Sequence, residues 1–462
     1  MLKKLRIKNF KCWQDTGDVK LAPLTLLFGT NSSGKSSIGQ FLMMLKQTTD
    51  RGDRKSAFYL GAGSKDSALQ LGSFRDIVRH HDIKNDVSFS YAWSLSDRNS
   101  IVDVHSGDVF DYNGISFSAN IGFKAKNAMP YVKDFRYELD DGGVKSTDVS
   151  LAINDNGVYK MHSSSYKFVR NPGRVWDMTS ALRFYGFPDE SNTYYQNAQF
   201  VHALNYQQEM LFKRLEYLGP MRSRPDRIYS WSGNEPDGVG EAGQYAISAM
   251  LAAADRKLSF KSHAHGVNFQ SVIADELRKL GLIDEFRVDP LSKDSAREYE
   301  VKVRTKNSRD WVNLPDVGFG ISQVLPVLVA CFYASPGSIL LIEEPEIHLH
   351  PSAQAALADV FIDVLKSRES GHKRGIQLIV ETHSEHFLRR LQRRIAEDVI
   401  AASDVASYFV DTKNDPTELR QLEVDKFGNI LNWPDGFFGN TTEDIITQTK
   451  IAIQRSSKGN HV

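Results

Sequence analysis

Cysteine is scarce in this chain, which has only two among its 462 residues, Cys12 and Cys331. Two cysteines this far apart in the sequence exclude a disulfide framework and a cysteine-ligated zinc site. Long apolar runs are missing too, since the longest, residues 321–334, falls short of the ~20 residues that span a bilayer. The charged N-terminus is followed by no apolar stretch, so we expect no signal peptide. These absences predict a cytoplasmic protein with no membrane partner.

Net charge and sequence repeats are also lacking. The 57 basic and 57 acidic residues cancel, while 41% of the residues are hydrophobic, enough for a sizeable core. We therefore expect a globular protein without a bulk attraction to nucleic acid or to anionic membranes, in which only a local patch could bind either. The chain shows no internal repeat and no sustained heptad, which argues against a long coiled-coil arm.

Hydrophobic periodicity predicts an α/β protein. Residues 24–28 form a short apolar strand, which a glycine-rich turn and an amphipathic helix follow. Alternating apolar residues between positions 87 and 160 predict antiparallel strands and hairpins. Residues 339–342 and 377–380 are short and fully apolar, which is typical of a buried parallel sheet. The chain therefore combines a parallel sheet with an antiparallel β region.

A phosphate-binding pattern lies between the first predicted strand and its helix. Residues 29–36 fit G-x-x-x-x-G-K-[ST], in which the glycines let successive backbone N–H groups point at phosphates near the positive end of the helix. Lys35 is placed to bridge the β- and γ-phosphates, and Ser36 to ligate Mg²⁺. A chance glycine and serine turn is the alternative, which the strand and helix context disfavours. The candidate binding residues are Gly29, Asn31, Ser32, Ser33, Gly34, Lys35, Ser36 and Ser37.

Two adjacent carboxylates follow a second predicted strand. Glu343 and Glu344 come directly after residues 339–342 and face opposite ways, so they cannot share one task. Glu343 is placed to hold Mg²⁺ directly or through water, and Glu344 to orient or deprotonate an attacking water. An acidic loop after a strand is common by itself, but the phosphate-binding pattern favours the functional interpretation.

Histidines mark the ends of the last motifs. His383 follows the apolar strand at residues 377–380, at the edge where α/β sheets bind their ligands. Together with His348 and His350 it raises the alternative of a zinc site. We regard zinc as disfavoured, because no cysteine lies nearby and the histidines come from separate segments.

The order of these motifs resembles the ABC-type ATPase superfamily. The resemblance implies a Walker A motif at residues 29–36, a signature at 316–323, a Walker B motif at Glu343 and Glu344, a D-loop at 346–350 and a switch histidine at His383. It also implies ATP and Mg²⁺ as ligands, with Glu344 and His383 as catalytic residues and Ser36 and Glu343 at the metal.

Two departures from the superfamily pattern concern the metal and the signature. Glu343 stands where the family usually has aspartate, so it reaches further toward the metal. In the signature, Gly318 occupies the serine position and Gly320 the glycine position, so backbone N–H groups, helped by Ser322, would meet the γ-phosphate. Asp76 and His81 are candidates for the Q-loop residue, which the sequence leaves unassigned.

Within the superfamily, residues 5–11 resemble the opening strand of the RecF, SMC and OLD branch. Residues 217–222 and 427–438 resemble compact OLD-like ATPases that accompany nucleases in phage-defence operons, such as the Septu ATPases. The resemblance implies a head-to-tail homodimer, or a larger even-numbered oligomer, with ATP between the Walker A motif of one subunit and the signature of the other. It further implies a co-encoded nuclease or another effector as the partner.

Two other functions remain open. One is a stand-alone RecF-like repair ATPase that binds DNA through a basic cluster with interleaved aromatic residues, made up of Lys213, Arg214, Arg222, Arg224, Arg227 and Tyr229. An ordinary solvated loop explains that cluster equally well. The other is the motor subunit of a membrane transporter, which the OLD-like N-terminus disfavours.

The resemblance predicts an ABC ATPase head with three parts. Residues 1–200 would form an N-terminal ATPase lobe with the Walker A motif and an antiparallel β subdomain. Residues 201–310 would form a mainly helical insertion. Residues 311–462 would form a C-terminal ATPase lobe with the signature, Walker B motif, D-loop and switch histidine. The expected fold class is α/β, with a mixed or parallel P-loop sheet and no long coiled coil.

Overall fold

The computed structural model describes residues 1–459 except 62–66, 104, 127, 174–176, 261–262, 293–296, 306–307, 413–414, 435–436 and 439–440. A six-stranded sheet runs through the middle of the chain's fold, in the order β10 (Leu215–Leu218), β17 (Ile339–Glu343), β20 (Gln377–Glu381), β4 (Leu24–Gly29), β21 (Val405–Asp411) and β22 (Glu418–Leu422). Neighbouring strands from β10 to β21 are parallel, and β22 alone pairs antiparallel. The short apolar runs therefore form the buried parallel sheet that their composition predicts.

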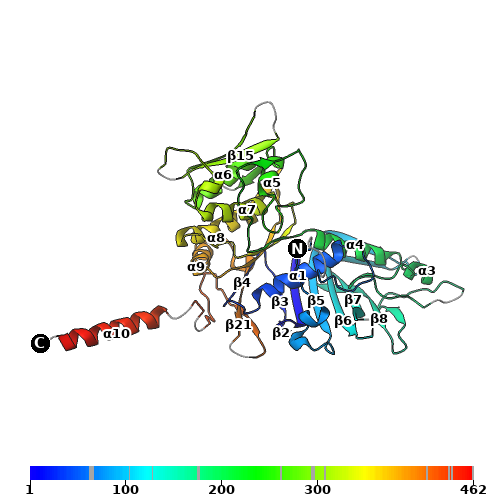
Figure 1. Cartoon of the computed structure of the whole chain (residues 1–462). Helices are drawn as coiled ribbons and strands as arrows, with labels where there is room; N and C mark the ends of the chain where they lie inside the picture. The colour runs from blue at the N-terminus through cyan, green and yellow to red at the C-terminus, as the bar shows by residue number, and fades with distance from the viewer. Residues whose placement is uncertain are drawn as a thin grey trace.

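An eight-stranded antiparallel sheet covers one side of the molecule (Figure 1). Its order is β2 (Trp13–Asp15), β1 (Leu2–Phe10), β5 (Val87–Val102), β6 (Val109–Lys124), β7 (Met129–Asp141), β8 (Val144–Ile153) and β9 (Tyr159–His162), with β3 (Val19–Lys20) paired to β1. The alternating apolar residues point into one core, which confirms the predicted antiparallel β region.

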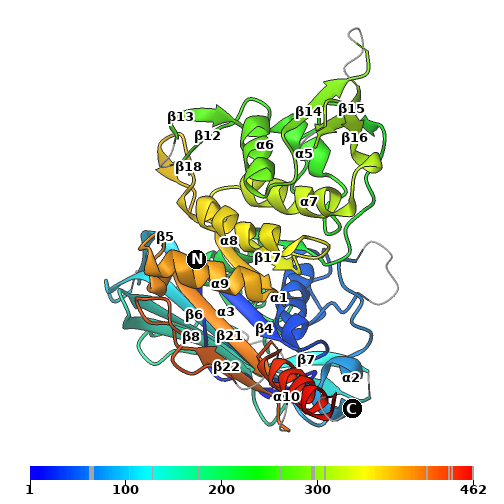
Figure 2. The ribbon, with the colours of Figure 1, turned by 90° about the vertical axis from the view of Figure 1, so that its left-hand side faces the viewer.

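Two smaller antiparallel sheets lie at the opposite end of the molecule. One contains β11 (Tyr229–Ser230), β15 (Glu298–Arg304), β14 (Glu285–Pro290) and β16 (Val312–Asn313). The other contains β13 (His263–Asn268), β12 (Lys257–Phe260), β18 (Arg368–Glu369) and β19 (His372–Lys373). Figure 2 shows them above the group of helices that includes α7 and α8, away from the eight-stranded sheet.

Helices lie on both faces of the central sheet and elsewhere in the fold. They are α1 (Lys35–Asp50), α2 (Phe74–Ile77), α3 (Ser191–Tyr194), α4 (Phe200–Lys213), α5 (Ala246–Ala252), α6 (Phe269–Lys279), α7 (Phe319–Tyr333), α8 (Pro351–Lys366), α9 (Glu385–Ala396) and α10 (Thr441–Gly459), with 3₁₀ turns at η1 (Arg79–His81), η2 (Leu314–Asp316) and η3 (Ala402–Asp404). The longest helix of the described residues is α10, with 19 residues, so this part of the chain has no long coiled coil. None of these helices combines the length and the apolar character that crossing a bilayer requires.

The core is layered because alternate residues of each central strand face opposite ways. Leu27 and Ile379 pack with α1 against the eight-stranded sheet, whereas Leu26, Ile342 and Val380 pack against α7, α8 and α9. The molecule is thus a layered α/β protein, as the sequence predicts. The carboxyl ends of β17, β20 and β4 meet at one edge of the sheet.

The segment that we expect to be mainly helical has a mixed structure. Residues 201–310 contain α4, α5 and α6 but also the strands β10 to β15. Strands β14 and β15 pair over six residue pairs, from Glu285 with Arg304 to Pro290 with Tyr299. The segment therefore combines helices with parallel and antiparallel strands and is not mainly helical.

Candidate active site

The phosphate-binding loop joins β4 to α1 through two constrained glycines. Gly34 precedes α1 at a φ of 104°, a conformation that favours glycine. A Cβ atom at Gly34 would lie 2.3 Å from the Sγ of Cys12, and one at Gly29 would lie 2.9 Å from the Oγ of Ser33. The pattern therefore needs glycine at both positions for steric reasons, and the loop lies at the N-terminus of α1.

Lys35 is buried at the start of α1, with 2% of its surface exposed. Its Nζ donates hydrogen bonds to the carbonyl oxygens of Gly29 at 3.1 Å and Thr30 at 2.7 Å. It also lies 3.8 Å from the Oε1 of Glu381, which accepts a 2.9 Å hydrogen bond from the Oγ of Ser36. Burial lowers the pKa of Lys35, while Glu381 opposes this shift. The lysine is thus held at the loop by carbonyl oxygens and a carboxylate.

The two carboxylates after β17 lie in different surroundings. Glu343 is buried, and its Oε1 accepts a 3.1 Å hydrogen bond from the hydroxyl of Tyr217. Its carbonyl oxygen accepts a 3.0 Å hydrogen bond from the guanidinium of Arg222. Burial raises the pKa of Glu343 to about 7. Glu344 turns away at a φ of 46°, and its backbone N–H donates to the carbonyl oxygen of Glu381 at 2.9 Å.

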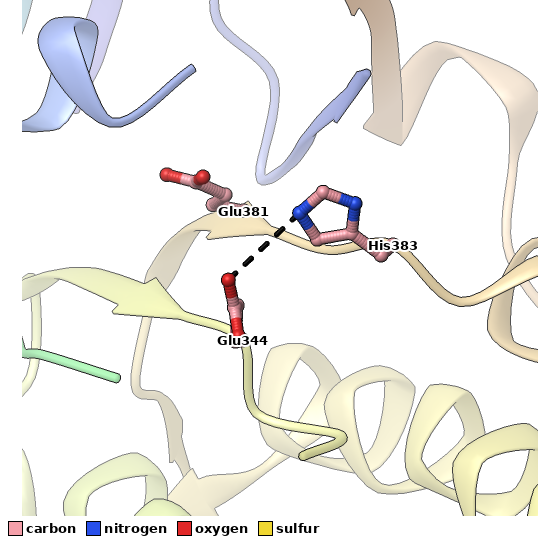
Figure 3. A group of neighbouring side chains, drawn as sticks. All are labelled: Glu344, Glu381 and His383. Atoms are coloured by element: carbon pink, nitrogen blue, oxygen red, sulfur yellow. Dashed lines mark ion pairs between the residues drawn. The ribbon is translucent and has the colours of Figure 1, made fainter. Parts of the chain in front are cut away.

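Glu344, Glu381 and His383 converge at the edge of the central sheet (Figure 3). One potential ligand atom from each of the three lies within 4.8 Å of the other two. The Nε2 of His383 is 3.8 Å from the Oε1 of Glu344, and burial lowers the pKa of His383, so the ring is neutral at pH 7. The Oε1 of Glu346 accepts 2.7 Å hydrogen bonds from the Oγ1 of Thr382 and the backbone N–H of His383. Glu346, in the predicted D-loop, thereby holds the backbone of His383 in place.

The three histidines do not gather at one metal site. His350 accepts a hydrogen bond from the backbone N–H of Ser352 at the start of α8. The ring of His348 lies 6.2 Å from that of Phe319. The ligand group that contains His383 includes neither of them, which removes the basis for a three-histidine zinc site in the described part of the chain.

A cavity of about 360 Å³ lies over the phosphate-binding loop. Its lining residues are Lys11, Cys12, Asn31, Ser32, Ser33, Gly34, Lys35, Ser36, Ser37, Gln40, Glu344, Glu381 and His383. Most of the predicted phosphate-binding residues and both predicted catalytic residues thus border one cavity. Glu343 is not among them, and its carboxylate accepts from Tyr217, whereas the hydroxyl of Ser36, its expected companion at the metal, donates to Glu381.

Four residues that line the cavity are not among the predicted site residues: Lys11, Cys12, Gln40 and Glu381. Glu381 had a usable signal, because it ends an apolar strand as Glu343 does. Lys11 and Cys12 come from the turn between β1 and β2, where the Nζ of Lys11 donates to the Oε1 of Gln40. Nothing local marks that turn, since only tertiary packing brings it to the loop.

The predicted signature lies away from this cavity. Gly318 precedes α7, and Gly320 faces the D-loop, because a Cβ atom there would lie 3.2 Å from the carbonyl oxygen of His348. The Oγ of Ser322 donates back to the carbonyl oxygen of Phe319 at 2.9 Å, within the same helix turn. None of these residues is among those that line the cavity. One chain therefore does not bring its signature and its phosphate-binding loop together.

The Q-loop candidates have local partners. The carboxylate of Asp76 accepts a 2.7 Å hydrogen bond from the backbone N–H of Ser73 and caps α2. The Nδ1 of His81 lies 2.9 Å from the carbonyl oxygen of Arg75. Neither lines the cavity, so the structure gives no support to either assignment.

The predicted basic cluster does not form one continuous face. Arg222 is buried against the end of β17, with 9% of its surface exposed. Arg227 pairs through both terminal nitrogens with the carboxylate of Asp316, at 3.0 and 2.6 Å. Lys213 lines a separate cavity beside β10. Because two of the arginines are engaged with this chain's own groups, the cluster is a poor match to a DNA-binding stripe.

The residues around the cavity fit a nucleotide with a divalent cation. The N-terminus of α1, the buried Lys35 and the Oγ of Ser33 suit phosphate oxygens, since that Oγ is buried without a hydrogen-bond partner among the residues that the structure describes. The hydroxyl of Ser36 and the neighbouring carboxylates offer the oxygen ligands that Mg²⁺ prefers. The arrangement thus suits phosphate chemistry at the carboxyl edge of a parallel sheet.

Three family models match parts of the chain. The family described as "AAA ATPase domain" matches residues 1–157, and "AAA domain, putative AbiEii toxin, Type IV TA system" matches residues 224–389. A "Protein of unknown function (DUF3696)" family matches residues 400–448. The first range contains the phosphate-binding loop, and the second contains Glu344 and His383. The fold, the site and these matches show an ATPase that resembles AAA domains in two parts of its chain.

Individual relatives are similar over most of the chain. An "ATP/GTP phosphatase" from Helicobacter pylori (strain ATCC 700392 / 26695) is 21% identical over 400 residues, which cover 86% of this chain and 89% of the relative. Among solved structures, an SMC head bound to the C-terminal winged-helix domain of ScpA is 11% identical, with a TM-score of 0.44 over 92% of this chain and 99% of that one. The SMC head domain from Thermotoga maritima is 12% identical, with a TM-score of 0.38 over 92% and 99% of the two chains.

Proposed function

We propose that the protein is an ATP-driven switch whose ATPase site is the cavity over the phosphate-binding loop. The loop N–H groups and Lys35 bind the phosphates, and Ser36 would hold Mg²⁺, with Glu343 as a supporting carboxylate. When bound, Mg²⁺ neutralises charge on the phosphates. The convergence of the phosphate-binding loop, Glu344 and His383 on one cavity carries this proposal.

The proposed hydrolysis uses Glu344 as the general base. Its carboxylate accepts a proton from the attacking water, whose oxygen forms the new bond to the γ-phosphorus as the bond to the ADP oxygen breaks. His383 is neutral at pH 7, so one ring nitrogen can donate a hydrogen bond to the γ-phosphate. Glu346 fixes the backbone of His383, which keeps the ring beside the carboxylate.

We further propose that the complete site forms between two subunits. Gly318, Gly320 and Ser322 lie at the start of α7, outside the cavity of their own chain. In a head-to-tail homodimer, or a larger even-numbered oligomer, this segment would close the partner's site and meet the γ-phosphate through its backbone N–H groups. ATP binding would close the dimer and hydrolysis would open it.

The proposed readout of the switch is a co-encoded effector, most simply a nuclease in an antiviral system. This part rests on the resemblance of residues 217–222 and 427–438 to phage-defence ATPases such as the Septu ATPase PtuA, although residues 435–436 lie outside the described part. The proposed parts of the chain are residues 1–200, 201–310 and 311–462. The DNA-repair alternative would regain support if the purified chain alone bound DNA in a salt-dependent manner.

The test is the native mass of the purified chain with and without Mg-ATP, for the wild type and Glu344→Gln. The variant keeps the phosphate-binding loop but lacks the base, so we expect it to accumulate as an ATP-bound dimer or larger even-numbered oligomer. The wild type should form the same species transiently. A chain that stays monomeric with ATP bound in both proteins would contradict the composite site.

A further inference from the structure

Strand order places Glu381, rather than Glu343, next to the phosphate-binding strand. In the central sheet β20 lies between β17 and β4. The Cα atom of Glu381 pairs with that of Leu27 in β4 on one side and with that of Glu343 in β17 on the other. Glu381 is therefore one strand away from the loop, whereas Glu343 is two strands away.

The contacts of the two carboxylates follow from this order. Glu381 is buried, its Oε1 accepts the 2.9 Å hydrogen bond from Ser36, and it lines the cavity. The carboxylate of Glu343 instead accepts from Tyr217. Its Oε1 lies 3.6 Å from the Cβ position of Gly39, about one helical turn beyond Ser36. Glu381 is thus the carboxylate in contact with the predicted metal-binding serine.

A second feature of the cavity independently indicates an anionic ligand. The side chain of Ser33 is 98% buried, since its exposed fraction is 2%, and its Oγ has no hydrogen-bond partner among the described residues. Ser33 borders the same cavity as Glu381. A buried hydroxyl without a partner is costly, and a phosphate oxygen at the loop would supply the missing acceptor. This places phosphate on the loop side and leaves Ser36 and Glu381 on the sheet side.

We propose that Glu381, together with Ser36, holds the divalent cation that accompanies the nucleotide, and that Glu343 supports this site indirectly. The ligand class is a hard, oxygen-preferring cation such as Mg²⁺ or Mn²⁺. Glu344 and His383 border the same space, as their ligand atoms lie within 4.8 Å of that of Glu381. The inference rests on the proposed nucleotide site and adds the residue that holds its metal.

A carboxylate at this position couples nucleotide affinity to the metal. Without a cation, the negative charge of Glu381 repels the phosphates across a largely desolvated site. With a cation bound between them, the same charge is attractive. We therefore expect the metal to increase nucleotide affinity strongly in the wild type, and Glu381→Gln to remove much of that increase without weakening metal-free binding.

The experiment measures the affinity of the full chain for a fluorescent ATP analogue in EDTA and in Mg²⁺. In Glu381→Gln the ratio of the two dissociation constants should fall by about tenfold or more, as is typical for loss of a metal-site carboxylate or its support. Electron paramagnetic resonance of Mn²⁺ with a non-hydrolysable ATP analogue should show weaker Mn²⁺ binding in the same variant. Ser36→Ala is the positive control. Glu385→Gln is the matched control, because Glu385 is a partly exposed carboxylate that pairs with Arg389 outside the cavity.

The outcomes separate this inference from the proposed function. Suppose that the wild type binds Mg-ATP and that Glu381→Gln keeps the full metal-dependent gain in nucleotide affinity, while Ser36→Ala loses that gain. Glu381 is then not a metal-site residue. If the wild type binds no nucleotide under either condition, the nucleotide site itself is wrong. Should Glu381→Gln fail to fold by its melting curve, Glu381→Asp carries the same test. It keeps the charge but retracts the carboxylate by one methylene, so an undiminished metal-dependent gain in that variant would overturn the inference.

Discussion

At the scale of single residues, the active site depends on close contacts that leave no room for a methyl group at the loop glycines. The Cys12 thiol lies against Gly34, so the turn between β1 and β2 forms one wall of the phosphate-binding loop. Burial raises the pKa of Cys12, so the thiol is protonated at neutral pH and serves as a packing group. The loop conformation is thereby set partly by a residue that precedes it by a whole strand.

Gly34→Ala tests this packing. The new methyl group would lie 2.3 Å from the Sγ of Cys12, and the backbone of the alanine would have to keep a φ of 104°. The strain and overpacking should cost about 2–4 kcal/mol in the free energy of unfolding and abolish ATP binding. Gly52→Ala is the matched control, since a Cβ atom there meets nothing within 4 Å. Calorimetry and nucleotide titration would measure both effects, and normal ATP binding by Gly34→Ala would contradict the geometry.

A second residue-scale prediction concerns pH. Burial raises the pKa of Glu216, on the edge strand β10, to about 7. The unfolded carboxyl titrates near ~4.3, so between these values only the folded form holds the proton, and stability falls as the pH rises toward about 7. Glu216→Gln should therefore stabilise the protein relative to the wild type at about pH 8, by at most about 4 kcal/mol, and lose this advantage near pH 4. Denaturant unfolding at both pH values measures the difference, and a difference independent of pH would show that folding does not raise the pKa of Glu216.

At the scale of elements, the D-loop and the end of β20 are tied together by one side chain. Glu346 is buried, and its Oε1 accepts from both Thr382 and the backbone of His383, whereas its Oε2 has no hydrogen-bond partner in the described part of the chain. Because Gly320 at the start of α7 also lies against the D-loop, a shift of the signature segment would reach His383 through Glu346. The D-loop thus links the end of β20 to the start of α7 around the proposed γ-phosphate position.

Glu346→Ala should loosen the link between the D-loop and the end of β20. Loss of two buried hydrogen bonds should lower kcat about 10- to 100-fold, because His383 is no longer held beside Glu344. Glu346→Gln keeps an Oε1 acceptor and should retain most of kcat, which distinguishes positioning from a need for the charge. Steady-state phosphate release measures both variants. Equal losses of kcat in Glu346→Ala and Glu346→Gln would show that the hydrogen bonds to the Oε1 of Glu346 do not determine the rate.

At the scale of the whole molecule, the phosphate-binding loop and the signature lie in different places. The start of α7 exposes Phe319, at 64% of its surface, and a Cβ atom at Gly318 would meet nothing within 4 Å. An exposed aromatic ring beside open space suits contact with another subunit. The proposed dimer would cover this segment and complete two sites at once.

Gly318→Asp tests the shared site because the folded monomer has room for the new side chain. The added carboxylate should leave the melting temperature unchanged but block ATP turnover by repelling the partner's γ-phosphate. Lys35→Ala should also be inactive. If subunits exchange, an equal mixture of the two variants should regain about a quarter of wild-type turnover, since half the dimers carry one intact site. No recovery in demonstrably mixed dimers would contradict the composite site.

The sequence by itself determined the contiguous and periodic features of this protein. The phosphate-binding loop, the apolar strands that end at Glu343 and before His383, and the antiparallel β region depend on local spacing, so they can be predicted without a structure. Tertiary structure decided which strands are neighbours. The order β17, β20, β4 sets Glu381 beside Ser36 and leaves Glu343 with Tyr217, while packing of the β1 to β2 turn brings Cys12 to the loop. Such contacts join residues distant in the chain, and the free energy of packing the whole core, rather than any local propensity, selects them.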